Sequence, residues 1–299
     1  MELEQRFSTE EDCKRYLFEL RWPDGFICPH CGGRKAWSTS RGLKLCGACR
    51  RQISVTAGTI CQDSHLPLTL WFRTMWYVAT QKNGVSALGL QQVLGLGSYK
   101  TAWAMLHKLR RAMVRPGRDR LRGTVEVDET YWGTEEKGVV GRLTEDKAII
   151  IVAAEEDGRG IGRIRLRRIS DLTKATLHGF IMDVVEEGNT VRTDGLRAYM
   201  GLNGYVHDRQ VQRRQPEGEH LLPRVHRVVS LLKRWMLGTH QGAIGHEHLD
   251  YYLDEFTFRF NRRTSRYRGK VFYRLVQQAV QIGPAPFHSL IKPQSLGGG

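Results

Sequence analysis

The middle of the chain alternates between short runs with the two-residue period of a β-strand and longer runs with the period of a helix. In residues 124–130, Val125 and Val127 point to one side of an extended chain, and Glu126 and Asp128 point to the other. Burying such carboxylates without a partner is costly. The run is therefore either an edge strand with a solvated face or a strand that brings its acids to a cation.

The same hydrophobic periodicity predicts a series of elements after this first strand. It predicts a buried strand, a strand with one basic face, an amphipathic helix, a short strand, a short helix and a fifth strand, at residues 147–154, 162–169, 172–187, 190–194, 196–202 and 205–211. Three strands in a meander, followed by helix, strand, helix and strand, is the order of the ribonuclease-H-like fold. We therefore expect an α/β domain whose mixed sheet is flanked by helices.

Three further helices are predicted towards the C-terminus. The first begins at Pro223, which suits a first helical turn, and it carries His226, Ser230 and Lys233 on one face. The others cover residues 249–260 and 271–282. The alternative is that His226 and Lys233 simply belong to an exposed polar face of this helix and have no role in a site.

Helical periodicity also precedes the first strand, from Leu68 onward. Two short helices separated by a glycine-containing turn resemble a helix-turn-helix, although an ordinary helical hairpin in a bundle has the same pattern. The second helix is expected from Tyr99 through Arg111. If it enters a DNA groove, its contacts are Tyr99, Lys100, Lys108, Arg110 and Arg111.

Four of the six cysteines form two C-x-x-C pairs with 14 residues between them, Cys28/Cys31 and Cys46/Cys49. This spacing is typical of a tetrahedral zinc site in a zinc ribbon. A thioredoxin-like redox pair would need a single C-x-x-C beside a βαβ pattern. We expect a structural Zn²⁺ that supplies most of the ribbon's folding free energy.

Composition favours a nucleic-acid partner. The 299 residues carry 46 Lys and Arg against 31 Asp and Glu, a formal net charge of +15. The alternative is that the charge only makes the surface basic and serves no nucleic-acid partner. No apolar run reaches the roughly 18 residues of a membrane span, and the first residues do not resemble a secretory signal. We expect a cytoplasmic, nucleoid-associated protein.

The expected organisation has five parts. These are a helical lead-in, a zinc ribbon, a helix-turn-helix-like DNA-binding domain, a ribonuclease-H-like catalytic domain and a C-terminal helix with a tail, at residues 1–24, 25–60, 66–120, 121–265 and 266–299.

A second acid strengthens the metal interpretation of the first strand. Asp194 ends the predicted strand at 190–194, immediately before Gly195. Two acids at strand ends can converge on a divalent ion, whose hard character prefers carboxylate oxygens.

Taken together, these motifs resemble the DDE-type transposases of bacterial insertion sequences, in particular the group with a zinc ribbon ahead of a ribonuclease-H-like domain. The resemblance rests on the four paired cysteines and on the runs at residues 125–130, 192–195, 230–234, 252–256 and 259–261. It extends over roughly residues 8–280.

The resemblance implies that two acids and a third residue on a late helix hold the catalytic metals, Mg²⁺ or Mn²⁺. Asp128 and Asp194 match the first two places, and the third, seven positions before Lys233, is His226. His226 either binds metal or positions the phosphate, since imidazole suits Mn²⁺ better than Mg²⁺. Glu217 and Glu219 are rival third ligands.

In a two-metal mechanism Glu126 would be an auxiliary metal ligand or would hold the direct ligands in place. Lys233 would contact a DNA phosphate. The implied partners are the double-stranded DNA of element ends and target, with no membrane, and a second copy of the chain in a homodimer or higher oligomer. The implied function is end cleavage and transfer of the 3′-OH to target DNA. Two alternatives remain: a non-catalytic zinc-dependent DNA-binding regulator, and a nuclease or resolvase without joining activity.

Overall fold

A computed structural model describes residues 2–115, 117–133, 147–211 and 221–291. The chain forms two compact units. The first combines Met1–Arg115 with Ser265–Gly299, and the second is Pro116–Thr264. The first unit is therefore built from both ends of the chain.

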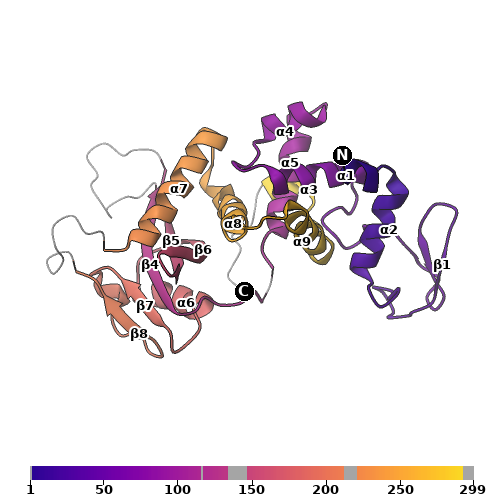
Figure 1. The fold of residues 1–299 in the computed structure, drawn as a ribbon. Coiled ribbons are helices and arrows are strands. Elements are labelled where there is room, and N and C mark those ends of the chain that lie inside the picture. Colours follow the sequence, from indigo (N-terminus) through magenta and orange to yellow (C-terminus); the bar gives the residue numbers. More distant parts are fainter. Residues whose placement is uncertain (1, 116, 134–146, 212–220, 292–299) are drawn as a thin grey trace. The chain divides into compact units, whose positions relative to one another are not determined.

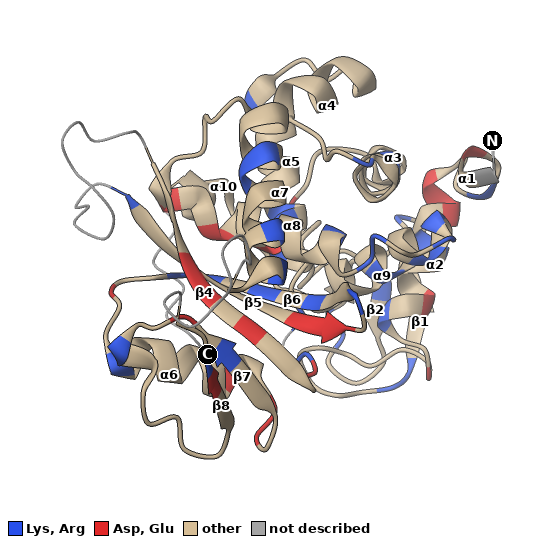
Figure 2. Cartoon of the chain, turned by 60° about the vertical axis from the view of Figure 1, so that its left-hand side comes forward, with Lys and Arg blue, Asp and Glu red and all other residues tan. Residues whose placement is uncertain are grey.

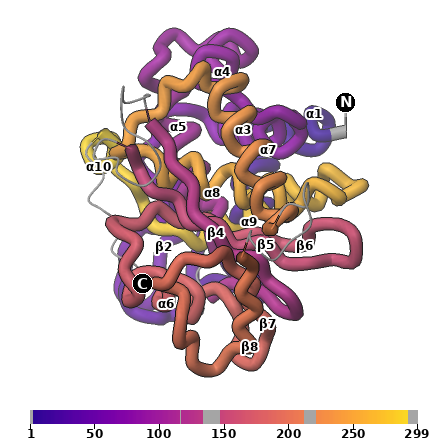
Figure 3. The backbone as a smooth tube through the Cα atoms, turned by 90° about the vertical axis from the view of Figure 1, so that its left-hand side faces the viewer, coloured from indigo at the N-terminus to yellow at the C-terminus, as the bar shows by residue number. Residues whose placement is uncertain are grey.

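The second unit is organised around a five-stranded mixed sheet (Figure 1). Its strands are β4 (Thr124–Trp132), β5 (Ala148–Asp157), β6 (Gly160–Ile169), β7 (Thr190–Thr193) and β8 (Val206–Arg209), in the order β6-β5-β4-β7-β8. The first three form an antiparallel meander, and β7 and β8 run parallel to β4. Figure 3 shows β4 at the centre of this sheet. The predicted fold class, a ribonuclease-H-like mixed sheet flanked by helices, is confirmed.

Helices cover both faces of the sheet, because alternate residues of β5 are apolar on each side. Helix α6 (Lys174–Val184) packs over Val125 and Val127, whereas α7 (Pro223–His240) and α8 (Leu249–Phe260) cover the opposite face. The short helices η1 (Arg197–Tyr199) and η3 (His246–His248) are 3-10 helices. No helix in the described part of the chain is long and apolar enough to cross a membrane.

The first unit begins with helices α1 (Glu2–Arg6) and α2 (Glu10–Arg21). Thr9 caps α2, because its hydroxyl accepts a hydrogen bond from the Asp12 N–H at 3.2 Å. Three short antiparallel strands follow, β1 (Ala36–Ser38), β2 (Lys44–Cys46) and β3 (Gln52–Ile53). These strands and the two cysteine knuckles form the ribbon.

The rest of the first unit is a bundle of helices α3 (Leu68–Thr80), α4 (Ala87–Leu94), α5 (Tyr99–Ala112), α9 (Arg268–Gln281) and α10 (Phe287–Ile291). Gly95, with φ of +63°, ends α4 in the left-handed conformation that a glycine adopts easily. Helix α9 packs on α3, with the Phe72 and Phe272 ring centres 5.9 Å apart. The sequence predicted that the helix at 271–282 was the last one, which is wrong because α10 follows it.

Candidate functional site

Strand β4, at the centre of the sheet, contains several acidic residues, which are the red bands on its ribbon in Figure 2. Glu126 is fully buried, and the Asp128 side chain is 16% exposed. The strand is flanked on both sides, by β5 and β7, so the edge-strand alternative for residues 124–130 is wrong. The acids of β4 therefore need partners from other elements.

Asp128, Glu129 and Asp194 converge. One carboxylate oxygen from each lies within 4.8 Å of the others. The parallel register explains the convergence, because Val127 of β4 pairs with Thr193 of β7 and the residue that follows each of them is an acid. The Leu196 N–H donates to Asp194 Oδ1 at 2.9 Å and orients that side chain at the end of its strand.

This group suits a divalent cation. Three neighbouring carboxylates repel one another, and a positive ion between them removes that repulsion. Oxygen–metal distances of about 2.0–2.6 Å allow oxygens that lie within 4.8 Å of one another to share an ion. The donor set consists only of carboxylate oxygens, which is what Mg²⁺ and Mn²⁺ prefer.

Glu129 is a member of this group that the sequence analysis missed. Alternation places it on the face of Val127, away from Asp128, so its carboxylate was not expected beside Asp194. Tyr199 of η1 is fully buried, and its hydroxyl donates to Glu129 Oε2 at 3.1 Å. Burial, together with the Glu129 charge, raises the pKa of Tyr199, so this hydroxyl stays a donor. Only the tertiary position of η1 could have identified Glu129.

His226 lies beside the acids without belonging to their group. Its Nε2 is 3.4 Å from Asp128 Oδ2, and its side chain is 50% exposed at the start of α7. Among the described residues, the converging group holds three acids and no histidine. The predicted rivals Glu217 and Glu219 lie outside the described residues.

Glu126 lies outside the converging group and contacts the first turn of α7. Its Oε2 accepts hydrogen bonds from the N–H groups of Arg224 and Val225, at 2.8 and 3.0 Å, and its Oε1 accepts one from the Arg224 guanidinium at 3.0 Å. A carboxylate at the first turn of α7 satisfies free N–H groups and the helix dipole. The structure thus uses Glu126 to hold α7, and not within the converging acids.

Lys233 lies two turns after His226 on α7 and is half-buried. Burial, with a further contribution from the nearby Lys147, lowers the pKa of its ammonium. Two neighbouring cations are each destabilised by the other and are stabilised by an anion between them. The chemistry of this pair fits a phosphate group.

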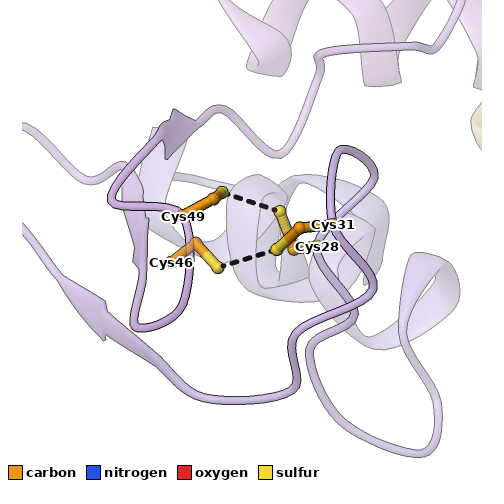
Figure 4. Close-up of side chains that lie close together, drawn as sticks. All are labelled: Cys28, Cys31, Cys46 and Cys49. Carbon is orange, nitrogen blue, oxygen red and sulfur yellow. Dashed lines mark hydrogen bonds between the residues drawn. The ribbon is translucent and has the colours of Figure 1, made fainter.

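The four ribbon cysteines also converge, as Figure 4 shows. Their sulfur atoms lie within 4.8 Å of one another, with Cys28 to Cys49 at 3.7 Å and Cys31 to Cys46 at 3.6 Å. Backbone N–H groups of Cys49 and Ala48 lower the pKa of Cys46 to about 6. A Cβ at Gly33 would lie 3.3 Å from the Cys46 sulfur, so a glycine leaves room for the cluster. Four thiolates in this arrangement fit a tetrahedral Zn²⁺.

The predicted DNA contacts on α5 differ in exposure. Tyr99 is 50% exposed, Lys100 is exposed, and Lys108 and Arg111 are partly exposed. Arg110 is only 2% exposed, and its guanidinium lies 3.2 Å from His107 Nε2. The prediction that Arg110 contacts DNA is wrong, because this side chain belongs to the packing of the helical bundle.

An acid on the central strand of a ribonuclease-H-like sheet, beside an acid that follows the adjacent parallel strand, is typical of metal-dependent nucleic-acid enzymes. Residues 120–261 match the ISXO2-like transposase domain, and residues 8–52 match the transposase zinc-ribbon domain. A relative named as an uncharacterized protein in transposable element ISH50 of Halobacterium salinarum is 28% identical over 291 residues, with 88% of this chain and 94% of that protein covered. The chain belongs to the DDE-type insertion-sequence transposases with an N-terminal zinc ribbon.

Proposed function

We propose that this transposase binds the ends of an insertion sequence, cleaves a phosphodiester bond there and joins the freed 3′-OH to target DNA. The convergence of Asp128, Glu129 and Asp194 carries this proposal. A regulator that only binds DNA would have no use for three adjoining carboxylates on the central strands of the sheet, since their mutual repulsion lowers stability.

Asp128 and Asp194 are the proposed ligands of the catalytic divalent ions, with Glu129 as a third. When bound by these carboxylates, two such ions would supply activation of the attacking oxygen and stabilisation of the departing one. Tyr199 holds Glu129 through its hydroxyl, and the Asp194 turn fixes the second acid. His226, beside Asp128, completes the ligand set or orients the Asp128 carboxylate. Lys233, with Lys147 nearby, is the proposed contact for a DNA phosphate.

The zinc ribbon is proposed to contact the DNA backbone. Residues 25–53 contain six Lys and Arg and no Asp or Glu. Five of these cations are exposed: Arg34, Lys35, Arg41, Arg50 and Arg51. A domain with this charge pattern attracts a polyanion, and its binding weakens as salt increases. Tyr99, Lys100, Lys108 and Arg111 of α5 are the proposed contacts of a helix-turn-helix. Bringing two ends together further implies a dimer or a higher assembly.

A joining assay tests the proposal. The substrate is a duplex with the terminal sequences of the element, pre-cleaved to expose its 3′-OH, mixed with plasmid target and Mg²⁺ or Mn²⁺. The wild-type chain is expected to join the two DNAs, and Asp128→Asn to reduce the rate by about 10³-fold or more, since ion-assisted stabilisation of several kcal/mol is lost.

The matched control is Asp183→Asn. Asp183 lies on α6, its side chain is 58% exposed and it pairs with Arg167, so its neutral analogue leaves the converging acids intact. This control is expected to join DNA at the wild-type rate. Joining by the Asp128→Asn protein at the control rate would rule out the assignment. Cleavage without joining would favour a nuclease or resolvase.

A further inference from the structure

The three-stranded sheet of the ribbon has a covered face and an open face. The covered face carries Cys46 and Ile53, which are 0% and 2% exposed and belong to the small apolar core of the ribbon. The open face carries Trp37 of β1, Leu45 of β2 and Gln52 of β3, because Leu45 pairs with both of the others and cross-strand partners share a face. An aromatic, an apolar and an amide side chain therefore form a row across the sheet.

Trp37 is accessible on this open face. Its side chain is 55% exposed, although tryptophan is on average a highly buried residue. The outer part of its six-membered ring lies against Gly47, where a Cβ would be 3.1 Å from Cη2 and 3.2 Å from Cζ3. Gly47 belongs to the knuckle between Cys46 and Cys49, and its N–H donates to the Lys35 carbonyl oxygen at 2.8 Å. The knuckle thus supports part of the indole and leaves the rest to solvent.

The charge around Trp37 favours a polyanionic partner. Lys35 is exposed and begins beside the indole, since the same Cβ at Gly47 would be 3.3 Å from the Lys35 Cβ. The ribbon carries six Lys and Arg in residues 25–53 and no Asp or Glu. Two such faces would repel each other, so this charge pattern disfavours contact between two copies of the ribbon and favours nucleic acid.

An exposed indole suits a base that is not paired. In a duplex, neighbouring base pairs cover both faces of each base, so an aromatic side chain reaches only the edges and the backbone. In an unpaired strand the face of the base is free, and stacking on an aromatic side chain stabilises the complex by about 1–3 kcal/mol. Strand cleavage creates free ends, at which bases leave the stack most easily.

We propose that the open face of the ribbon holds an unpaired base of the DNA at the element end. The base stacks on Trp37 next to Leu45, and Lys35 contacts a neighbouring phosphate. The inference rests on the proposed function, since it needs DNA held by the ribbon. It adds recognition of strand state to a domain whose cations contact only the backbone.

A binding comparison tests this assignment with the full zinc-loaded chain, in buffer without Mg²⁺ or Mn²⁺. One duplex carries a short single-stranded thymidine tail, and the other carries a tail of the same length made of abasic nucleotides. The phosphates are then equal, and only the bases differ. By fluorescence anisotropy the tail with bases is expected to bind roughly 5- to 100-fold more tightly, the range of a stacked base. Trp37→Ala is expected to abolish this difference, and Trp37→Phe to keep part of it.

Two further variants separate stacking from charge. Tyr267→Ala removes an aromatic side chain of the same unit that is 67% exposed, and it is expected to keep the full difference between the tails. Lys35→Gln is expected to weaken binding of both tails by a similar factor, because both carry the phosphate. An unchanged affinity of Lys35→Gln for both tails would contradict the phosphate contact. Zinc content, at about one per chain, shows that each variant retains the ribbon.

The outcomes distinguish this inference from the proposed function. A difference between the tails that is absent in the wild-type chain, or unchanged in Trp37→Ala, would overturn the base contact. Failure to bind either DNA would overturn the DNA-binding role as well, whereas equal binding of the two tails contradicts only the base contact.

Photocrosslinking gives a second readout that does not depend on the variants folding. With 5-iodouracil in the tail, the crosslinked peptide is expected to contain Trp37, and a crosslink confined to other peptides would contradict the assignment. Sedimentation of the DNA-free chain covers the other occupant of this face. If Trp37→Ala converts an oligomer into a monomer, the face is a contact between copies of the chain and the proposal fails.

Discussion

Neighbouring acids on β4 have different tasks, although they are close in sequence. Glu126 faces the N-terminus of α7 and accepts three hydrogen bonds there. Asp128 and Glu129 lie two and three residues further on and turn towards Asp194. Because the Glu126 carboxylate fixes the first turn of α7, it also fixes His226, two residues beyond Arg224, beside Asp128.

Glu126→Gln is therefore expected to lower the free energy of unfolding by about 2–3 kcal/mol, because hydrogen bonds to a buried charge are lost. The measurement is guanidinium denaturation of the full chain with hydrogen exchange of α7 peptides. Glu156→Gln is the matched control, since Glu156 pairs with the same Arg224 but its side chain is 30% exposed. We expect this control to cost less than about 1 kcal/mol. Equal effects of the two changes would contradict the positioning role.

At the scale of elements, regular periodicity made the second unit predictable. The helix at 249–260 matches α8 at both ends, and Pro223 begins α7 as expected. The order of the strands in the sheet could also be predicted, because the rules for meanders and crossover connections allow few other topologies. The convergence of Asp128 with Asp194 was predictable for the same reason, since both acids follow the alternation of adjacent strands.

Contacts between distant elements were not predictable from local patterns. Glu129 reaches the acids through its contact with Tyr199, 70 residues away. Arg110 belongs to a run of basic residues that is expected to be exposed, yet tertiary packing buries it beside His107. A cavity lined by Ala104 of α5 is also lined by Phe287, from the opposite end of the chain. Periodicity reports which face of an element is apolar, not what covers it.

The ribbon is an element that has little apolar core of its own, apart from a small cluster around Trp22, Phe26 and Ile53. Its fold is therefore expected to depend on the metal. Cys46→Ser should remove the bound zinc and the hydrogen-exchange protection of residues 25–53, while β4 and β5 keep theirs. Cys13→Ala is the control, since Cys13 is a buried thiol outside the cluster, and it should keep about one zinc per chain. Full ribbon protection in the zinc-free Cys46→Ser protein would contradict this dependence.

At the scale of the whole molecule, the chain separates its tasks between two units. The first, made from both termini, carries the cysteine cluster and the helical bundle. The second carries the converging acids on its sheet. This division matches the two domains that the comparisons identified, a zinc ribbon at 8–52 and a transposase domain at 120–261. The net charge of +15 provides long-range attraction to DNA.

The central claim is that acids from two strands share divalent ions. It is tested most directly by titrating the zinc-loaded full chain with Mn²⁺ and measuring free Mn²⁺ by electron paramagnetic resonance. Asp128→Asn and Asp194→Asn are each expected to weaken binding by about tenfold or more, as the loss of a charged ligand requires, and Asp183→Asn to leave it unchanged. Wild-type Mn²⁺ affinity in both the Asp128→Asn and Asp194→Asn proteins would contradict the account.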